Sequence, residues 1–118
     1  MDTEWDEYLQ SLSNKYGKIT NLIWISKKRR KYVLEFAYTR MLVINDEVYK
    51  FKDIVSCKIE KACIFAKGNR KSLRALYLAY RNEQPNQYAL SVTVWSKSVA
   101  SEINDLIQEI VKSNKILQ

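Results

Sequence analysis

The run Lys27-Lys28-Arg29-Arg30-Lys31 holds the residues of this chain that are best suited to binding an anion. Five adjacent cations repel one another, so folding alone gives little reason to concentrate them in one turn. Clustered lysine and arginine can contact the phosphates of nucleic acid or anionic lipid, or an acidic face of another protein. A solvated hairpin tip without a ligand is the structural alternative.

A second polar turn is also basic, with Lys67, Arg70, Lys71 and Arg74 in or just after it. If the two turns lie at the same end of the fold, they form one basic rim that suits phosphate groups. If they lie at opposite ends, the case for a phosphate-binding site is largely lost. The sequence leaves both placements open.

The formal net charge is +7, and the basic excess lies between residues 15 and 81 rather than in a terminal tail. A basic surface of this kind attracts acidic proteins, nucleic acid or anionic lipid. Lysine-rich strand edges that discourage aggregation between sheets explain the same excess without a ligand. We expect a protein partner first, with nucleic acid and anionic lipid as alternatives.

Exposed aromatic rings would support binding of single-stranded nucleic acid, because bases stack on them. Most rings of this chain alternate with polar residues in strand-like segments, which favours packing in the core or across strands. Trp24 and Tyr80 stand in the opposite register from neighbouring residues of core type. These two rings are therefore the candidates for exposure.

The chain contains no histidine, so the usual general base of enzymes is missing. A glycine-rich phosphate loop and a nucleophile elbow are absent as well. Cys57 and Cys63 are too few for a structural zinc site, and they can pair only if they lie on neighbouring strands in register. Cys57 alternates with Val55 and Ile59, so these three side chains are expected to share one face, with Cys57 in the core. We predict no enzyme activity, no catalytic residue, no metal and no cofactor.

Apolar spacing indicates the elements that position these residues. Residues 3–15 carry Trp5, Tyr8, Leu9 and Leu12 at helical spacing, and Gly17 follows as a helix stop. Strand-like segments then span 19–26, 32–39, 41–44, 48–51, 54–61, 73–80 and 88–95, with residues 62–66 either continuing the strand before them or starting the next. The run 45–47 is a predicted turn.

A closing helix is predicted over residues 98–112, capped by Ser96 or Ser98. One apolar stripe runs along it, made of Val99, Ile103, Leu106, Ile107, Ile110 and Val111. A twisted sheet of this length curls and leaves an open end that such a helix can cover. The expected fold class is α+β, mainly β: a partly open antiparallel barrel of six or seven strands. Residues 1–16 form an extra N-terminal helix, and residues 17–118 form the barrel with its closing helix, as one domain overall.

Residues 42–56, LVINDEVYKFKDIVS, resemble the bacterial pleckstrin-homology-like (PH-like) domain proteins, in which a short I-N-x-x-x-Y-x-F-x-D-I hairpin precedes a long strand. Residues 91–111 look like the last strand and closing helix of the same fold. The resemblance implies a seven-stranded, partly open barrel and a non-enzymatic binding or scaffolding role. In eukaryotic pleckstrin-homology domains the first hairpin grips phosphoinositide headgroups, and Lys27, Arg29 and Lys31 occupy similar ground here.

The first functional expectation is a bacterial or phage binding or scaffolding module that acts through protein–protein contact. A nucleic-acid-binding module that uses the two basic turns, and a small phage-encoded inhibitor of a host defence complex, are the alternatives. We expect the N-terminal helix to pack onto the barrel, and a homodimer formed through this helix is the alternative. No secretory signal and no apolar stretch long enough to span a bilayer is visible, so the expected location is cytoplasmic.

Overall fold

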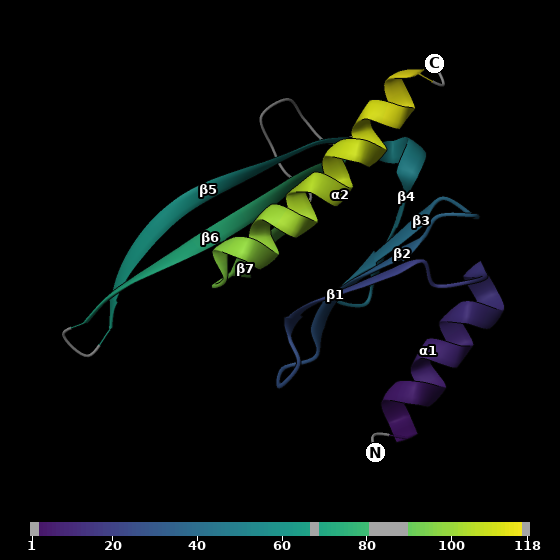
Figure 1. Cartoon of the computed structure of the whole chain (residues 1–118), viewed down its shortest axis with the longest axis horizontal. Helices are drawn as coiled ribbons and strands as arrows, with labels where there is room; N and C mark the ends of the chain where they lie inside the picture. The colour runs from purple at the N-terminus through teal and green to yellow at the C-terminus, as the bar shows by residue number, and fades with distance from the viewer. Residues whose placement is uncertain (1–2, 67–68, 81–89, 117–118) are drawn as a thin grey trace.

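The computed structural model describes residues 3–66, 69–80 and 90–116, and within them the side chains of all residues except 62–66, 69–73, 76–80 and 90–91. This part of the chain folds into two antiparallel sheets and two long helices (Figure 1). Helix α1 (Thr3–Tyr16) lies against the first sheet, and helix α2 (Lys97–Ile116) packs mainly against the second. The predicted fold class, α+β and mainly β with a helix at each end, is confirmed.

The first sheet is a meander of four strands, β1 (Asn21–Ser26), β2 (Lys31–Phe36), β3 (Met41–Ile44) and β4 (Glu47–Lys50). Its two faces pack into two different apolar clusters. On β2, Tyr32 and Leu34 belong to one cluster and Val33 belongs to the other. Because successive side chains of a strand point to opposite faces, this sheet is the middle layer of the molecule.

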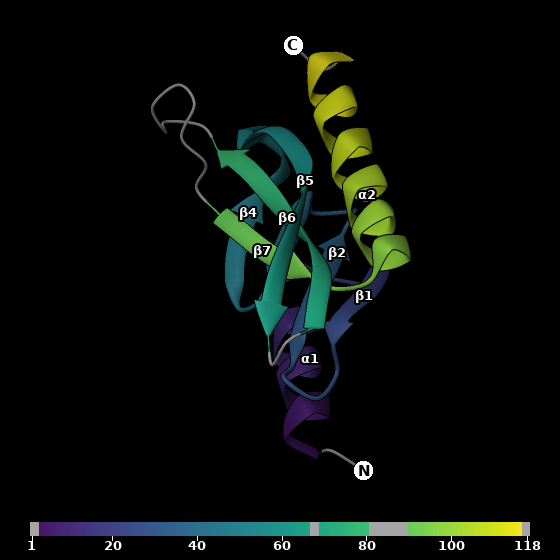
Figure 2. The same ribbon diagram turned by 90° about the vertical axis from the view of Figure 1, so that its left-hand side faces the viewer.

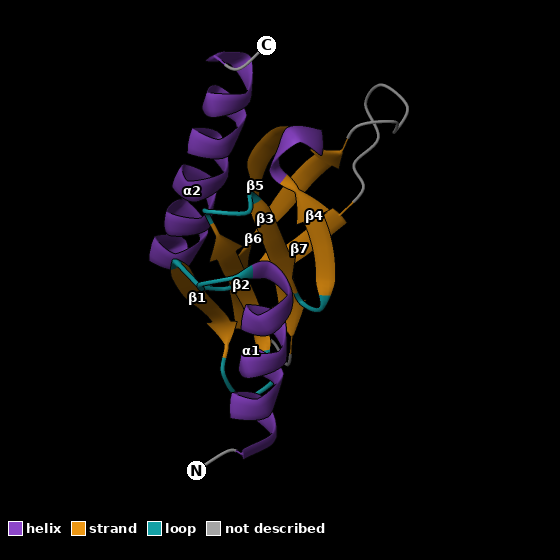
Figure 3. Cartoon of the chain, turned by 90° about the vertical axis from the view of Figure 1, so that its right-hand side faces the viewer, coloured by secondary structure: helices purple, strands orange, loops and turns teal. Residues whose placement is uncertain are grey.

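Helix α1 covers the outer face of the first sheet, as Figure 3 shows from the α1 side. Its apolar side chains, Trp5, Tyr8, Leu9, Leu12 and Tyr16, pack against the buried residues Tyr32, Leu34, Phe36 and Val43. The helix ends as predicted at Gly17, which adopts a φ of 87° and donates its N–H to the Ser13 carbonyl at 2.8 Å. The N-terminal helix therefore packs within its own chain.

The second sheet has the order β5-β6-β7 and faces the viewer in Figure 2. It consists of β5 (Ile54–Ala66), β6 (Asn69–Tyr80) and β7 (Leu90–Val94), and the 3-10 turn η1 (Phe51–Asp53) leads into it from β4. Residues 62–66 thus continue β5. Within the described residues the two sheets do not pair with each other, so the seven strands form an open barrel rather than a closed one.

Helix α2 packs against residues of both sheets. The buried residues of the helix, Ala100, Ile103, Ile107, Ile110 and Val111, join a cluster with Ile23, Val33, Leu42, Ile44, Val92 and Val94. Ser96 is the N-cap, because its Oγ accepts the Val99 N–H at 3.3 Å. The predicted role of the closing helix as the cap of the barrel is confirmed.

Two predictions about strands are wrong in detail. A bulge between Ile54 and Ser56 interrupts the β5–β6 register, so Ile54 and Cys57 are buried while Val55 is 53% exposed. Val55 and Cys57 therefore do not share a face. Strand β2 also ends at Phe36, three residues early, and leaves Tyr38 78% exposed in the turn that follows.

Candidate binding cleft

The basic turn occupies the tip of the β1–β2 hairpin, and all five of its cations are exposed. The turn is held by its backbone: the Arg30 N–H donates to the Lys27 carbonyl at 3.2 Å, and the Arg29 N–H donates to Ser26 Oγ at 3.3 Å. Arg30 adopts a φ of 51°, in the left-handed region. The cations of the turn do not all line one site, because Arg29 and Lys31 line one pocket and Arg30 lines another.

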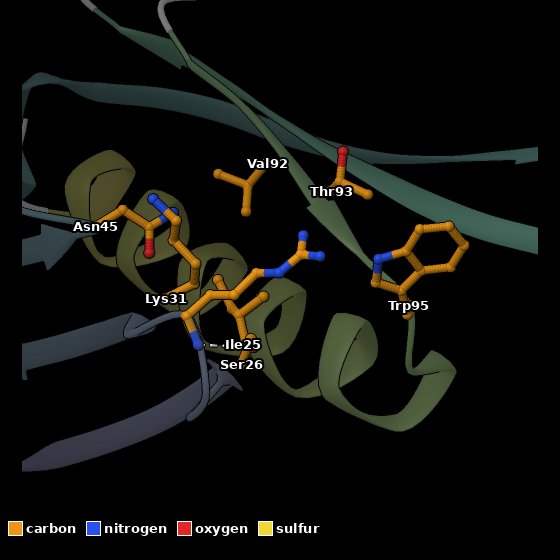
Figure 4. Close-up of a pocket in the computed structure, with 8 residues that line it drawn as sticks. Ile25, Ser26, Lys31, Asn45, Val92, Thr93 and Trp95 are labelled. Atoms are coloured by element: carbon orange, nitrogen blue, oxygen red, sulfur yellow. Dashed lines mark hydrogen bonds between the residues drawn. The ribbon is translucent and has the colours of Figure 1, made fainter.

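Arg29 and Lys31 line a cleft of about 530 Å³ between the β1–β2 hairpin and the end of β7 (Figure 4). Ile25 and Val92 are apolar residues of its wall, Asn45 lies beside Lys31, and Trp95 stands at the opposite end. Ser26 and Thr93 complete the lining, so the cleft combines two cations, an indole ring, aliphatic side chains and small polar ones. Such a mixture is typical of sites that bind a ligand with both acidic and apolar groups.

Trp95 is fixed in the cleft by the residues on either side of it. Val94, the last residue of β7, is fully buried, and Ser96 begins α2 as its N-cap. The chain must turn from strand to helix between them, which leaves the Trp95 side chain 51% exposed. An exposed tryptophan on a well-anchored backbone loses little conformational entropy on binding.

Asn45 closes the other end of the cleft as part of a tight two-residue turn. Asn45 and Asp46 adopt φ angles of 48° and 74°, as the turn between β3 and β4 requires. The Asn45 Oδ1 accepts the Tyr32 N–H at 2.7 Å, and the Asn45 N–H donates to the Tyr32 carbonyl at 3.1 Å. These bonds hold the β3–β4 turn to β2 next to Lys31.

Arg30 faces a different pocket, of about 330 Å³, on the α1 side of the first sheet. Trp5, Tyr8, Tyr32 and Asp46 line it with Arg30. Burial and the hydrogen bond to Asp46 raise the pKa of the Tyr32 hydroxyl, because both favour its neutral form. This pocket thus contains a carboxylate beside its cation, whereas the residues that line the cleft include no acid.

Of the two rings predicted as candidates for exposure, the structure describes the side chain of Trp24 only. The Trp24 ring is partly buried and stacks on Trp5 at 4.9 Å between centroids, so it is not the freely exposed ring that the sequence indicates. The α1 helix covers the face on which Trp24 stands. The Tyr80 side chain lies outside the described residues. Sequence reasoning does not single out Trp95, although its position between a strand and a helix cap is a usable signal.

The second basic turn is shorter than predicted, because β6 begins at Asn69 and not at residue 73, so Arg70 and Lys71 lie on a strand paired with β5. Lys67 and the side chains of Arg70 and Lys71 lie outside the described residues, so whether the two turns form one rim stays a prediction. Arg74 is half-buried and pairs with Val94 on β7.

The two cysteines both lie on β5, six positions apart, which places them far beyond disulfide distance, and Cys57 is free. Among the residues that the structure describes, no three acidic or cysteine side chains gather as a metal site would require.

Comparison with protein-family models, curated proteins and solved structures finds no match for this chain. None of the described helices is both long and apolar enough to cross a membrane. The case for a function therefore depends on the residues of the cleft and on the fold that positions them.

Proposed function

We propose that this protein is a non-enzymatic binding module whose cleft takes an acidic segment of a partner protein. The observation that carries the proposal is that Arg29, Lys31, Val92 and Trp95 line one open cleft. The two cations would pair with acidic side chains of the segment, and the indole ring with an apolar one. Tryptophan and arginine are the residues that contribute most often to the energy of protein interfaces.

The edge of the second sheet supports a peptide as the ligand. Strand β7 is the last strand in the order β5-β6-β7, so in the described structure only one of its edges pairs with another strand. An extended segment can add to such an edge through backbone hydrogen bonds, with alternate side chains reaching the adjoining pocket. In this arrangement the side chains on one face of the segment would meet Arg29 and Lys31.

Nucleic acid is the second candidate, because Lys27 and Lys28 remain exposed at the hairpin tip outside the cleft and are available for phosphates. Binding of a single strand relies on successive aromatic rings on which bases stack. Trp95 offers one such ring, but Trp24 packs beneath α1 on the other side of the first sheet. This separation favours the acidic protein segment over the nucleic acid.

The proposal includes membership of the PH-like class and a cytoplasmic location. Four plus three antiparallel strands, with a C-terminal helix that packs against both sheets, support the first. Two cysteines that cannot pair with each other fit a reducing compartment and support the second. Two kinds of partner fit this proposal: a bacterial protein, and a host defence complex that a phage protein inhibits. The partner is the one of these that carries an acidic segment able to enter the cleft.

The test follows the indole N–H signals of the three tryptophans by NMR, with the Trp95 signal assigned from Trp95→Phe. The probes are a synthetic peptide of alternating glutamate and valine, its alternating glutamine and valine counterpart, and an oligo-thymidine strand. The acidic peptide is expected to shift the Trp95 signal and to leave those of Trp5 and Trp24 in place, because the latter two stack on each other away from the cleft.

Two double charge reversals of equal size distinguish binding in the cleft from binding to the rest of the basic turn. The double variant R29E/K31E is expected to weaken the acidic peptide at least about tenfold, which corresponds to about 1.4 kcal/mol. The matched variant K27E/K28E changes the net charge equally and is expected to retain most of the binding. Equal losses in both variants, or a Trp95 shift with oligo-thymidine and not with the acidic peptide, would reject the protein-segment proposal, and the second result would favour nucleic acid.

A further inference from the structure

We propose that the acidic segment lies in the cleft as an eighth strand, with backbone hydrogen bonds to β1 on one side and to β7 on the other. This inference rests on the proposed function and adds the way in which the segment is held. The segment would thus close the open barrel. The partner must then supply an extended stretch of chain whose backbone groups are unpaired on both sides, such as a terminal tail or a loop.

The cleft runs along the edge of β7 and not over one of its faces. Val92 and Thr93 are consecutive residues of β7, and both line the cleft. Their side chains point to opposite faces of the sheet, since Val92 is buried in the core and Thr93 is exposed. A space that touches both side chains must lie beside the strand, where the N–H and C=O groups of an edge point. Ile25 and Ser26, the last residues of β1, line the other side.

Both of these strands are edges in the described structure. Strand β1 is the first in the order β1-β2-β3-β4 and β7 is the last in the order β5-β6-β7, so each pairs with one neighbour only. The unpaired backbone groups of an edge are a template for a further strand. Helix α2 contacts both strands, and Ile103 shares the larger core cluster with Ile23 of β1 and Val92 of β7. The helix therefore fixes the two edges relative to each other before a ligand binds.

The other junction between the sheets is already covered by side chains of α2. Where β4 leads through η1 into β5, Asn114 Nδ2 donates to the carbonyls of Phe51 and Ile54. Gln108 Nε2 donates to the Cys57 carbonyl at 2.8 Å. Among the described residues, no side chain bonds in this way to the backbone of β1 or β7. Of the two junctions, the one between β1 and β7 is thus the one with strand edges open to a ligand in the described structure.

The side chains at the two ends of the cleft agree with a strand that touches both edges. Trp95 directly follows β7, so a segment paired with β7 passes the indole ring. Arg29 and Lys31 belong to the hairpin that β1 opens, so a segment paired with β1 passes the two cations. Figure 4 shows Lys31 and Asn45 at one end of the cleft and Trp95 at the other. One segment between the two strands therefore meets all of these side chains.

The test uses two modified forms of the alternating glutamate and valine peptide. Successive N–H groups of a strand point to opposite edges, so all the glutamate N–H groups face one neighbouring strand and all the valine N–H groups face the other. One form carries N-methyl groups on two central glutamates, and the second carries them on two central valines. Both keep the charges and side chains of the parent peptide, so each is the matched control of the other.

Each methylated peptide is expected to bind at least about tenfold more weakly than the parent peptide in the NMR titration. Hydrogen exchange in the parent complex is expected to slow at amides of both β1 and β7, with the edge strand β4 unchanged as the internal control.

The inference is overturned if fewer than two of the methylated peptides lose affinity, or if the added protection is confined to β7. In those cases the acidic peptide still binds in the cleft, and the proposed function stands. A parent peptide that does not bind at all would remove the proposed function and this inference together.

Discussion

The hydroxyl of Tyr8 on α1 lies 2.7 Å from the hydroxyl of Tyr32 on β2. The Tyr32 hydroxyl donates to Oδ1 of Asp46, and the Tyr8 hydroxyl, which has a single proton, is within donating distance of the Tyr32 hydroxyl and, at 2.9 Å, of the same Oδ1. Helix α1 has no fully buried residue, and its other contacts with the first sheet are largely apolar, such as Trp5 on Trp24. This group of three polar residues is thus a directional link that sets how α1 lies on the sheet.

Replacing Tyr8 with phenylalanine is expected to lower the free energy of unfolding by about 0.5–1.5 kcal/mol, because the ring remains and the hydrogen bond that the Tyr8 hydroxyl donates is lost. Urea denaturation measures the change. Tyr38→Phe is the matched control, since Tyr38 is 78% exposed and its change should be close to zero. Equal effects of the two variants would show that the Tyr8 hydroxyl contributes nothing to holding α1.

Among the polar residues of α2, Asn114 is expected to contribute most to the free energy of unfolding. Its Nδ2 donates to the carbonyls of Phe51 at 2.5 Å and Ile54 at 3.2 Å, and its Oδ1 accepts from Arg40. Asn114→Ala is expected to lower the free energy of unfolding by about 1–3 kcal/mol, because half-buried partners lose their hydrogen bonds. Asn104→Ala, on the same helix, removes only one long bond to Gln108 at 3.4 Å and should cost much less. The prediction fails if the two alanine variants unfold at the same urea concentration.

The closing helix should contribute most of its stability through its buried stripe. Ile107 is 2% exposed inside the larger core cluster, so Ile107→Ala is expected to cost about 2–5 kcal/mol, from lost burial and the cavity that remains. Ile116→Ala, at the 75% exposed end of the same helix, should change stability little. A small effect at Ile107 in thermal or urea unfolding would mean that α2 does not cap the barrel in solution.

The sequence could predict the elements whose signal is local. The stripe that contains Ile103 and Ile107 follows directly from helical spacing, and Ser96 caps the helix as expected. The bulge at Val55 could not be predicted, because an extra residue in a strand changes the pairing without changing the apolar pattern. Apolar residues on both faces of the segment that contains Ile23 and Trp24 were the available signal that a helix covers the outer face.

The candidate sites depend on contacts that the sequence does not contain. The cations at 27–31 are visible in the sequence as a run, but only the folded hairpin shows that Arg29 and Lys31 line one pocket and Arg30 another. Trp95 joins the cleft only because β7 lies opposite the hairpin.

The burial of the Cys57 thiol should make the folded protein less stable at alkaline pH. Burial raises the pKa of the Cys57 thiol to about 11 from an ordinary value of 9.0, because the core disfavours the thiolate. The unfolded thiol therefore ionises first as pH rises. The stability that Cys57 contributes is fully present below pH 9 and is lost between pH 9 and pH 11, by up to about 2 kcal/mol.

The experiment compares Cys63→Ala with the double variant C57A/C63A, each unfolded by urea under reducing conditions across this pH range. The difference in free energy of unfolding between the two should shrink as pH rises past 9, because only Cys63→Ala retains the buried thiol. Tyr8 and Tyr32 also have raised pKa values, so both proteins should lose further stability above about pH 10. Parallel curves from pH 8 to 11 would mean that the thiol of Cys57 ionises as readily in the folded protein as in the unfolded chain, which a side chain only 7% exposed should not allow.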